Sequence, residues 1–375
     1  MDRLDELQRW WRGSRPRRFW RRVADGLTLA ELWTQFRKET TSSYRVYSRT
    51  VAWPSAREGG RRWLDTAQAL LWAMLGKLSP ARRVFLLLTL LTLLWGLFAP
   101  HRNATLLAAV LLLVLLALEL ADRVAMKRDL EIARDIQAWL LPQQPPIVPG
   151  VDIAFSTRPA NTVAGDFYDA FVRHPEAAAG APAPLLLVVA DVAGKSMPAA
   201  LLMATFQASL RTVAHEPTTL PELVARVNRY ACEHSLEGRR FTTAFFAELE
   251  PAAGTLRYVN AGHNPPLVRR VSGELVRLEA GGLPLGIREA PAYESQTLTL
   301  ARGDLLVIYT DGIVEAENES REEYGEARLA ELVRTLVPAT AADGLARILA
   351  SVTGFTGAAP QLDDTTCMVV RYPAG

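Results

Sequence analysis

The chain is 375 residues long, enough for two or more structural units with a sizeable core. It has only two cysteines, Cys232 and Cys367, which excludes a disulfide framework and suits a reducing, cytosolic location. A cysteine-dependent phosphatase needs Cys, five further residues and then Arg, but here Gly238 and Pro373 occupy the position of that Arg. The full phosphate-loop pattern Gly-x-x-x-x-Gly-Lys-Ser/Thr, which would bind nucleotide phosphates, is likewise missing.

The formal net charge of +2 hides a strongly basic beginning. Residues 1–80 contain 16 Lys and Arg against 8 Asp and Glu, about +8, which leaves about −6 for the remainder. Within residues 9–22, arginines alternate with tryptophan and phenylalanine, a composition that suits the surface of an anionic bilayer. We therefore expect residues 1–80 to form a basic cytoplasmic region that contacts membrane lipids; the alternative is a partly disordered tail. No folded DNA-binding motif is visible, and we expect no nucleic-acid partner.

Two uncharged apolar runs follow, at residues 84–99 and 104–118, with a short turn between them. Each is near the length of about 20 residues that crosses a bilayer, so we expect a transmembrane helical hairpin over residues 81–121. A pair of buried core helices is the alternative. Basic residues flank both ends of the hairpin, namely Arg82, Arg83, Arg123, Lys127 and Arg128. Lys and Arg residues that flank membrane spans are usually on the cytoplasmic side. We therefore expect a multi-pass protein of the cell inner membrane with its N- and C-terminal parts in the cytoplasm.

Residues 122–145 have the pattern of a charged linker helix. Ile132, Ile136 and Trp139 lie on one helical face. Extending their heptad backwards places Asp122 and Asp129 in the same seam, so a homodimer through this helix would be weak. The alternative is that the apolar stripe packs on its own domain. Several prolines after residue 141 end the helix and mark a domain boundary.

The remaining residues, 146–375, alternate runs of strands with pairs of helices. Strands are expected at residues 151–157, 185–191, 241–249, 255–260, 267–270, 293–300, 305–309 and 365–372. Helices are expected at residues 197–214, 220–235, 327–336 and 341–351. This order indicates an α/β domain of the α+β kind, with two sheets covered by helices, rather than a Rossmann sheet.

Four acidic clusters carry the chemistry of this domain. They are Gly165-Asp166-Phe167-Tyr168-Asp169, Asp191-Val192-Ala193-Gly194-Lys195, Thr310-Asp311-Gly312-Ile313 and Asp363-Asp364-Thr365-Thr366. Three of them adjoin an expected strand. One aspartate at a strand end is usually only a turn former. Four such clusters in one domain predict a site for a hard divalent cation, since Mg²⁺ and Mn²⁺ take several oxygen ligands.

Further motifs complete a recognisable set. They are Glu131-Ile132-Ala133-Arg134-Asp135-Ile136-Gln137, Leu140-Leu141-Pro142, Asn260-Ala261-Gly262-His263-Asn264-Pro265-Pro266 and Gly282-Leu283-Pro284-Leu285-Gly286. With the acidic clusters, and in this order, they resemble the SpoIIE/RsbU-type phosphatases, bacterial relatives of the metal-dependent PPM (type 2C) enzymes. The resemblance covers about residues 127–372 and implies an α-β-β-α sandwich.

The resemblance also implies a function. It suggests a membrane-anchored protein serine/threonine phosphatase that hydrolyses phosphoserine or phosphothreonine on a signalling protein with a metal-activated water. The implied partner is a phosphorylated anti-sigma-factor antagonist, and the implied cofactors are two Mn²⁺ or Mg²⁺ ions. The alternative is a catalytically silent membrane-bound scaffold or sensor that uses the same domain to bind a partner. The intact acidic clusters favour the enzyme.

Site residues are carried over from the family motifs one by one. Asp191 would bridge the two ions, the Val192 carbonyl would add a ligand, and Asp166 would ligate from the first strand pair. Asp311 would hold the second ion together with Asp363 or Asp364, of which the motif alignment favours Asp363.

Three other residues are weaker candidates. The arginine that binds phosphate in eukaryotic relatives has no clear counterpart, and Arg158 is a candidate by position only. His263 lies in a turn rich in glycine and proline, and we expect it to be structural. Tyr168 is expected to pack rather than to react.

Overall fold

The computed structural model describes residues 75–76, 78–98, 102–173, 183–194, 197–234, 240–279 and 281–373. Nearly all of the expected basic region 1–80 lies outside these residues, as do Pro100 and His101 of the expected turn between the apolar runs, and Lys195 of the second acidic cluster. The chain divides into two compact units, Met1–Arg123 and Val124–Gly375.

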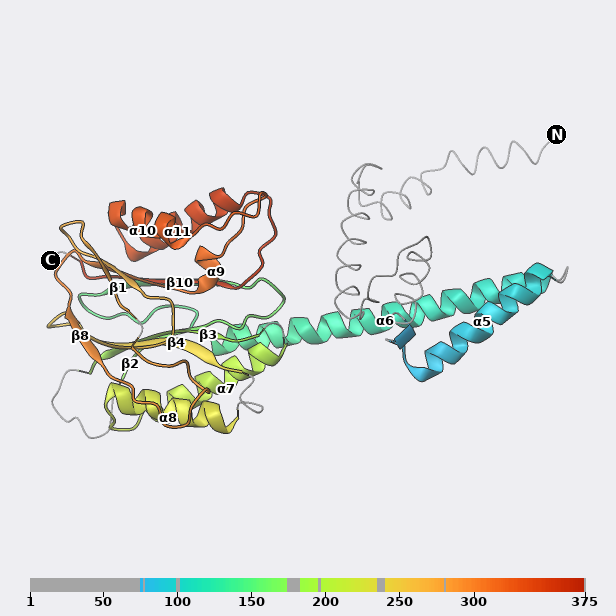
Figure 1. Ribbon diagram of the computed structural model, residues 1–375, viewed down its shortest axis with the longest axis horizontal. Coiled ribbons are helices and arrows are strands. Elements are labelled where there is room, and N and C mark those ends of the chain that lie inside the picture. Colours follow the sequence, from blue (N-terminus) through green and yellow to red (C-terminus); the bar gives the residue numbers. More distant parts are fainter. Residues whose placement is uncertain are drawn as a thin grey trace, which may run out of the picture. The chain divides into compact units, whose positions relative to one another are not determined.

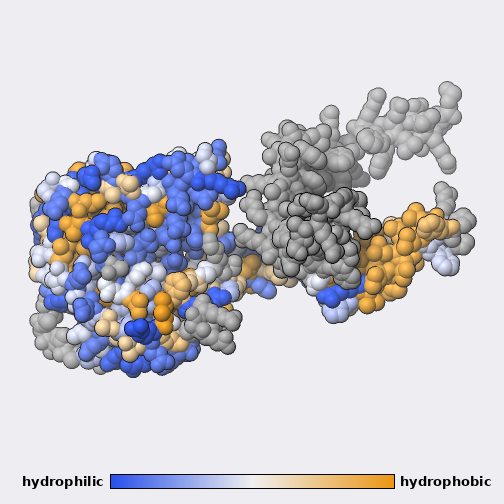
Figure 2. Space-filling view, viewed as in Figure 1, coloured by the Kyte–Doolittle hydropathy of each residue, from blue (hydrophilic) through white to orange (hydrophobic). Residues whose placement is uncertain are grey.

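The described part of the first unit is a pair of apolar helices, α5 (Pro80–Phe98) and the beginning of α6 (Arg102–Leu140). Both are long and apolar enough to cross a membrane, with mean hydropathies of 1.7 and 2.6. Their leucines are largely exposed, and hydrophobic side chains cover the surface of α5 (Figure 2). At the base of the pair, Arg82 forms ion pairs with Glu119 and Asp122 at 3.1 and 2.7 Å. The two expected helices are therefore present, and the second continues without a break into the expected linker helix.

The second unit contains two five-stranded antiparallel sheets in its described residues (Figure 1). One has the order β1 (Asp152–Arg158), β10 (Thr365–Arg371), β9 (Leu305–Tyr309), β6 (Leu267–Arg269) and β7 (Leu275–Arg277). The other has the order β2 (Phe167–Val172), β3 (Leu185–Val192), β4 (Thr242–Glu250), β5 (Thr255–Ala261) and β8 (Gln296–Thr299).

Helices cover the outer face of each sheet. The pair α7 (Met197–Ala214) and α8 (Leu220–Glu233) lies on the sheet that contains β3, and the pair α10 (Glu326–Thr335) and α11 (Ala341–Thr356) lies on the sheet that contains β9 (Figure 1). A short helix, α9 (Asp311–Val314), follows β9. The expected α-β-β-α sandwich is confirmed.

Strand β9 shows why the layers form as they do. All five of its residues are buried. Leu306 and Ile308 belong to the core shared with the second sheet, whereas Leu305, Val307 and Tyr309 belong to the core beneath α10 and α11. Because successive side chains of a strand point to opposite faces, a continuous apolar run is stable only where both faces are covered.

Most of the expected elements are present, with limits shifted by a few residues. Three short elements were not expected from the sequence: β2, β7 and α9. Of these, β2 matters most, because it begins inside the first acidic cluster.

Candidate active site

One half of the candidate site lies at the end of the β2–β3 pair. Asp166 comes directly before β2, and Asp191 is the penultimate residue of β3. Phe167 pairs with Ala190 in antiparallel register. The next residues along the two strands, Asp166 and Asp191, therefore lie opposite each other.

The other half comes from the second sheet, where β9 ends and β10 begins. Asp311 is the first residue of α9, and Asp363 and Asp364 come directly before β10. Cys367 pairs with Tyr309, and the Thr310 N–H donates to the Thr366 carbonyl at 3.1 Å. The second pair of acidic clusters is thus held together by the β9–β10 register.

Gly312 is required for this close approach. A Cβ atom at position 312 would collide with the carbonyl oxygen of Asp364. The glycine of the Thr310-Asp311-Gly312-Ile313 motif therefore lets the first turn of α9 lie directly against the Asp363-Asp364 turn. This explains a motif residue to which the sequence alone assigns no role.

A threonine links the two halves. The Thr310 hydroxyl donates to Asp166 Oδ2 at 2.9 Å and accepts the Thr366 N–H at 3.1 Å. Asp166 is buried, with 2% of its surface exposed. The carboxylate beside β2 is therefore oriented by a hydroxyl from the opposite sheet.

The carboxylates are close enough to perturb one another. Burial, followed by the charges of Asp311, Asp363 and Asp364, raises the pKa of Asp191 to about 7. Burial and the charge of Asp191 raise the pKa of Asp166 well above its ordinary value. Such mutual repulsion is relieved by a bound cation, and shifts of this size are typical of functional sites.

The neighbours Asp363 and Asp364 have different surroundings. Asp364 accepts the Ala160 N–H at 2.7 Å with one oxygen and the Gly165 N–H at 2.5 Å with the other. It thereby holds the segment that leads from β1 to Asp166. Asp363 accepts the N–H of Asp364 at 2.9 Å and borders a surface cavity. This geometry favours Asp363 as a ligand and Asp364 as a residue that positions Asp166.

The donor set suits Mn²⁺ or Mg²⁺ in its chemistry, because the converging side chains are carboxylates. In the described part of the chain, however, no three His, Cys, Asp or Glu side chains are gathered closely enough to hold a metal ion as they stand. The carboxylates instead accept hydrogen bonds from Thr310, Ala160 and Gly165. Their side chains would have to reorient to act as ligands together. The Val192 carbonyl lies near this group, 3.1 Å from where a Cβ at Gly165 would stand.

Two other motif residues have structural roles. His263 is buried, its Nδ1 lies 3.0 Å from the Thr243 hydroxyl, and burial lowers its pKa to about 4. Its neighbour Gly262 has a φ of 71° and packs against Pro284, so two of the motifs contact each other. His263 is therefore a neutral core residue, as expected.

The first acidic cluster also contains residues that point away from the candidate site. Asp169 is fully buried and accepts two hydrogen bonds from Arg211, each of 2.8 Å. The Tyr168 ring packs at a tilt against Phe155, with the ring centroids 4.7 Å apart, which fits the expected packing role. Only Asp166 of this cluster joins the other carboxylates.

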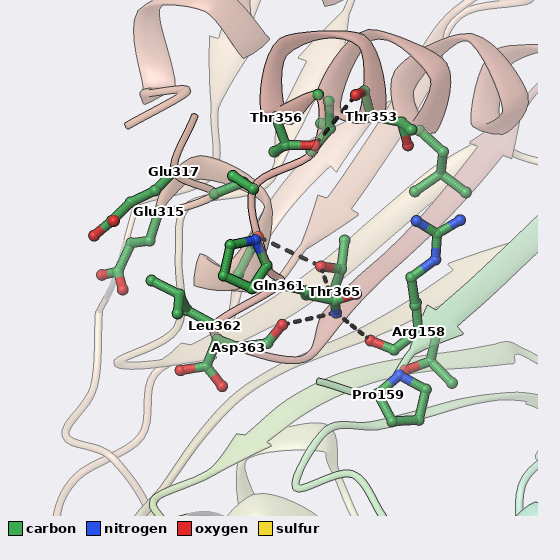
Figure 3. A pocket seen from close by; sticks show the side chains of 18 of the residues that line it. Arg158, Pro159, Glu315, Glu317, Thr353, Thr356, Gln361, Leu362, Asp363 and Thr365 are labelled. Carbon is green, nitrogen blue, oxygen red and sulfur yellow. Dashed lines mark hydrogen bonds between the residues drawn. The ribbon is translucent and has the colours of Figure 1, made fainter. Parts of the chain in front are cut away.

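Two glutamines support the site and were not identified from the sequence. Gln361 Nε2 donates to the carbonyls of Arg158 and Asp363 at 2.7 and 2.8 Å (Figure 3). Gln137 is buried in α6 and exchanges two hydrogen bonds with the backbone of Ala164, at 2.7 and 2.9 Å. Gln137 belongs to a motif that the sequence revealed, but its contact is between segments far apart in the chain.

Known proteins share this fold and these sequence features. Residues 182–373, just over half of the chain, match the family Stage II sporulation protein E (SpoIIE). The phosphoserine phosphatase RsbU of Bacillus subtilis is 29% identical over 195 residues, covering 52% of this chain and 56% of RsbU. Protein IcfG of Synechocystis is 28% identical over 282 residues, covering 68% of this chain and 43% of IcfG. The chain thus spans about half the length of these relatives.

A solved structure supports the fold. The PP2C domain of SiaA from Pseudomonas aeruginosa superposes with a TM-score of 0.58 at 20% identity, covering 67% of this chain and 98% of that domain. At this identity, the likeness concerns the fold alone. The SpoIIE match contains Asp191, Asp311, Asp363 and Asp364, whereas Asp166 precedes it. The chain therefore belongs to the SpoIIE family of PP2C-type phosphatase domains.

Proposed function

We propose that this chain is a membrane-anchored, metal-dependent protein serine/threonine phosphatase. One observation carries the proposal: carboxylates from the ends of strands in both sheets converge, and burial together with their charges raises the pKa of Asp191 to about 7. A scaffold has no need to hold like charges together at a cost in stability, whereas a cation site requires it.

The residues proposed to hold Mn²⁺ or Mg²⁺ follow from the family motifs and the local contacts. Asp191 would lie between two ions, with Asp166 and the Val192 carbonyl on one side and Asp311 and Asp363 on the other. When bound, the ions would acidify a water molecule and neutralise phosphoryl charge, which is how such sites hydrolyse phosphoesters.

The other residues of the site orient and hold these ligands. Thr310 orients the Asp166 carboxylate, and Asp364 fixes the segment before it. Gln361 holds the backbone at Asp363.

A cysteine nucleophile is not needed for this proposed reaction. Burial raises the pKa of Cys367 to about 12, so this thiol is not ionised at neutral pH.

The proposed substrate is a phosphoserine or phosphothreonine on a signalling protein, and more narrowly a phosphorylated anti-sigma-factor antagonist. Support comes from the similarity to RsbU, which is named a phosphoserine phosphatase. The sequence motifs that resemble this family point the same way.

The proposed location is the cell inner membrane. The exposed leucines of α5 and of the first part of α6 suit a lipid environment, and the mean hydropathies of 1.7 and 2.6 support two spans. The flanking residues Arg82, Arg83, Arg123, Lys127 and Arg128 would keep both ends of the hairpin in the cytoplasm. A protease added outside intact cells should then leave the C-terminal domain uncut.

A weak homodimer through α6 is also proposed. Ile132, Ile136 and Trp139 are exposed on this helix, with 49%, 53% and 85% of their surfaces accessible. They repeat on one face, as a coiled-coil seam does. The charge of Asp129 in the same seam would keep the association weak.

Phosphate release from a phosphoserine peptide by the full-length protein in detergent tests the proposed activity. We expect turnover with Mn²⁺ or Mg²⁺ and none with EDTA. A protein that binds the phosphopeptide but releases no phosphate under any metal condition would instead be the silent scaffold.

A further inference from the structure

A surface cavity of about 340 Å³ opens beside the proposed metal ligands (Figure 3). Asp363 and Gly312 belong to its lining, so the cavity and the candidate active site share a wall. The other walls come from the end of β1, from α11 and from the segment that precedes β10. Its volume is at the lower end of the range of about 300–1,000 Å³ that is usual for ligand pockets.

The lining of this cavity is amphipathic. Leu349 and Val352 of α11 supply apolar surface, and Thr353 and Thr356 add hydroxyl groups on the same helix. These groups suit the side chains of a peptide, since such pockets combine apolar area with a few polar groups that fix orientation. None of them is used by the proposed hydrolysis.

Charges of opposite sign lie on two sides of the cavity. Figure 3 shows the Arg158 side chain extending toward α11 on one side, with Glu315 and Glu317 on the other. No ion pair or hydrogen bond of the Arg158 guanidinium is found within the described residues, whereas many other arginines of this domain are paired. The cation is therefore accessible to a ligand that enters the cavity.

The position of Arg158 is tied to the candidate site through its backbone. Its carbonyl accepts a hydrogen bond from Gln361 Nε2 at 2.7 Å, and the same nitrogen donates to the Asp363 carbonyl at 2.8 Å. Arg158 and Asp363 thus line the same cavity, which places Arg158 within reach of residues next to a phosphoserine held by metal ions at Asp363. A small substrate without such residues would not reach this side chain.

We propose that this cavity recognises the residues adjacent to the phosphorylated side chain of the protein substrate, and that Arg158 pairs with an acidic side chain among them. Glu315 and Glu317, on the opposite side of the cavity, would repel an acidic side chain of the substrate. The positive and negative sides of the cavity therefore also set the direction in which the substrate lies. The inference rests on the proposed phosphatase activity and adds a substrate preference to it.

Kinetics on matched phosphopeptides test this inference. The full-length protein is assayed with Mn²⁺ on phosphoserine peptides that carry Glu, Ala or Lys, one flanking position at a time, and on p-nitrophenyl phosphate. We expect a higher kcat/KM for Glu than for Lys at one or two positions, expressed mainly in KM. Exposed ion pairs change affinity by about twofold to fivefold, and charge reversal adds repulsion. Arg158→Glu should therefore change the Glu-to-Lys ratio about tenfold and favour the Lys peptide.

The matched control is Arg229→Glu, which makes the same charge change at an exposed residue of α8, in the helical layer on the other sheet. This variant should keep the wild-type ratio and the wild-type turnover of p-nitrophenyl phosphate. Arg158→Lys should retain most of the preference for Glu.

Three results would overturn the inference. A Glu-to-Lys ratio that is the same in wild type and Arg158→Glu would show that the cavity does not recognise the acid. Equal losses on all peptides and on p-nitrophenyl phosphate would mean that Arg158 acts on the phosphoryl group itself. Absence of metal-dependent hydrolysis of every substrate by the wild type would contradict the proposed function, and the inference would fall with it.

Discussion

Strand β9 has an aspartate at each end, and the two ends differ in what surrounds the carboxylate. Asp304, just before the strand, is buried and pairs with Arg270 at 2.7 Å. It also accepts the N–H groups of Val271 and Ala301, both at 2.9 Å. Asp311, just after the strand, is half-buried and lies close enough to Asp191 for its charge to raise the pKa of that carboxyl.

The difference separates structural from functional aspartates. The charge of Asp304 is balanced by a cation and by N–H donors, so this residue stabilises the fold. The charge of Asp311 faces other carboxylates, an arrangement that opposes folding until a cation binds. Removing the paired carboxylate of Asp304, or removing Asp191 from the cluster that Asp311 faces, should therefore have opposite consequences for stability and for turnover.

The largest effect is expected from Asp191→Asn. Because Asp191 is proposed to contact both ions, its loss should lower phosphate release at least about a hundredfold. Stability without metal should be unchanged or higher, since one of the repelling charges is gone. Asp304→Asn should do the reverse: the free energy of unfolding falls by about 2 kcal/mol, while turnover per folded molecule stays near wild type. Turnover and melting temperature of both variants check this pair of outcomes.

Unchanged turnover in Asp191→Asn would remove this residue from the site. Equal losses of turnover in both variants, measured on folded protein, would show that the paired aspartate and the clustered aspartates do not differ in the way proposed.

Gly312→Ala should also affect turnover strongly. Its Cβ would push the Asp363-Asp364 turn away, so we expect at least a tenfold loss of turnover together with a few kcal/mol of stability. Gly262→Ala is the matched control, because its Cβ would meet Pro284 at 2.6 Å and its φ is 71°. This second variant should lose stability but keep its turnover per folded molecule. Similar turnover in the two variants would contradict the close approach assigned to Gly312.

A smaller effect concerns pH and His263. Its pKa is about 4 in the folded protein against 6.5 for an ordinary histidine, so the unfolded state binds more protons between these values. The free energy of unfolding should therefore rise with pH through this window, with the full contribution of up to about 3 kcal/mol present above about pH 6.5. In His263→Asn, this part of the rise in the free energy of unfolding with pH should be absent. Unfolding curves of both proteins from about pH 4 to 7.5 measure it, and parallel slopes would show that His263 is not buried as a neutral group.

The smallest effect is expected at the linker helix. Asp129→Leu replaces a charge in the seam of α6 with an apolar residue, which should favour the dimer and alter turnover a few-fold. Measuring the mass of wild type and Asp129→Leu in solution together with their turnover tests this prediction. If the variant dimerises without a change in turnover, or stays monomeric, α6 is a passive tether.

The layers of the fold could be predicted because the strands are strongly apolar. Leu185 to Ala190 and Leu305 to Tyr309 are continuous hydrophobic runs, and each is buried on both faces. Strand β2 was missed because its first residues belong to an acidic motif, which masks the strand pattern. Strand β7 has only three residues, too few for a period to be visible.

The aspartates of the candidate site could be predicted by motif, but their individual roles could not. Asp363 and Asp364 are adjacent and chemically identical, and only the tertiary contacts show that Asp364 accepts the N–H groups of Ala160 and Gly165. The same holds for Gln137 and Gln361, whose partners lie on other segments of the chain. A single sequence contains no information about such long-range contacts.

Calorimetric titration of Mn²⁺ into the full-length protein tests the central claim most directly, namely that the carboxylates at the ends of β3 and β9 form a metal site together. Wild type and Asp304→Asn should both bind Mn²⁺ saturably and should melt at a higher temperature when it is present. Asp191→Asn should lose both the binding and the thermal shift. Binding by Asp191→Asn that equals the wild type, or a wild-type melting temperature indifferent to Mn²⁺, would contradict the account.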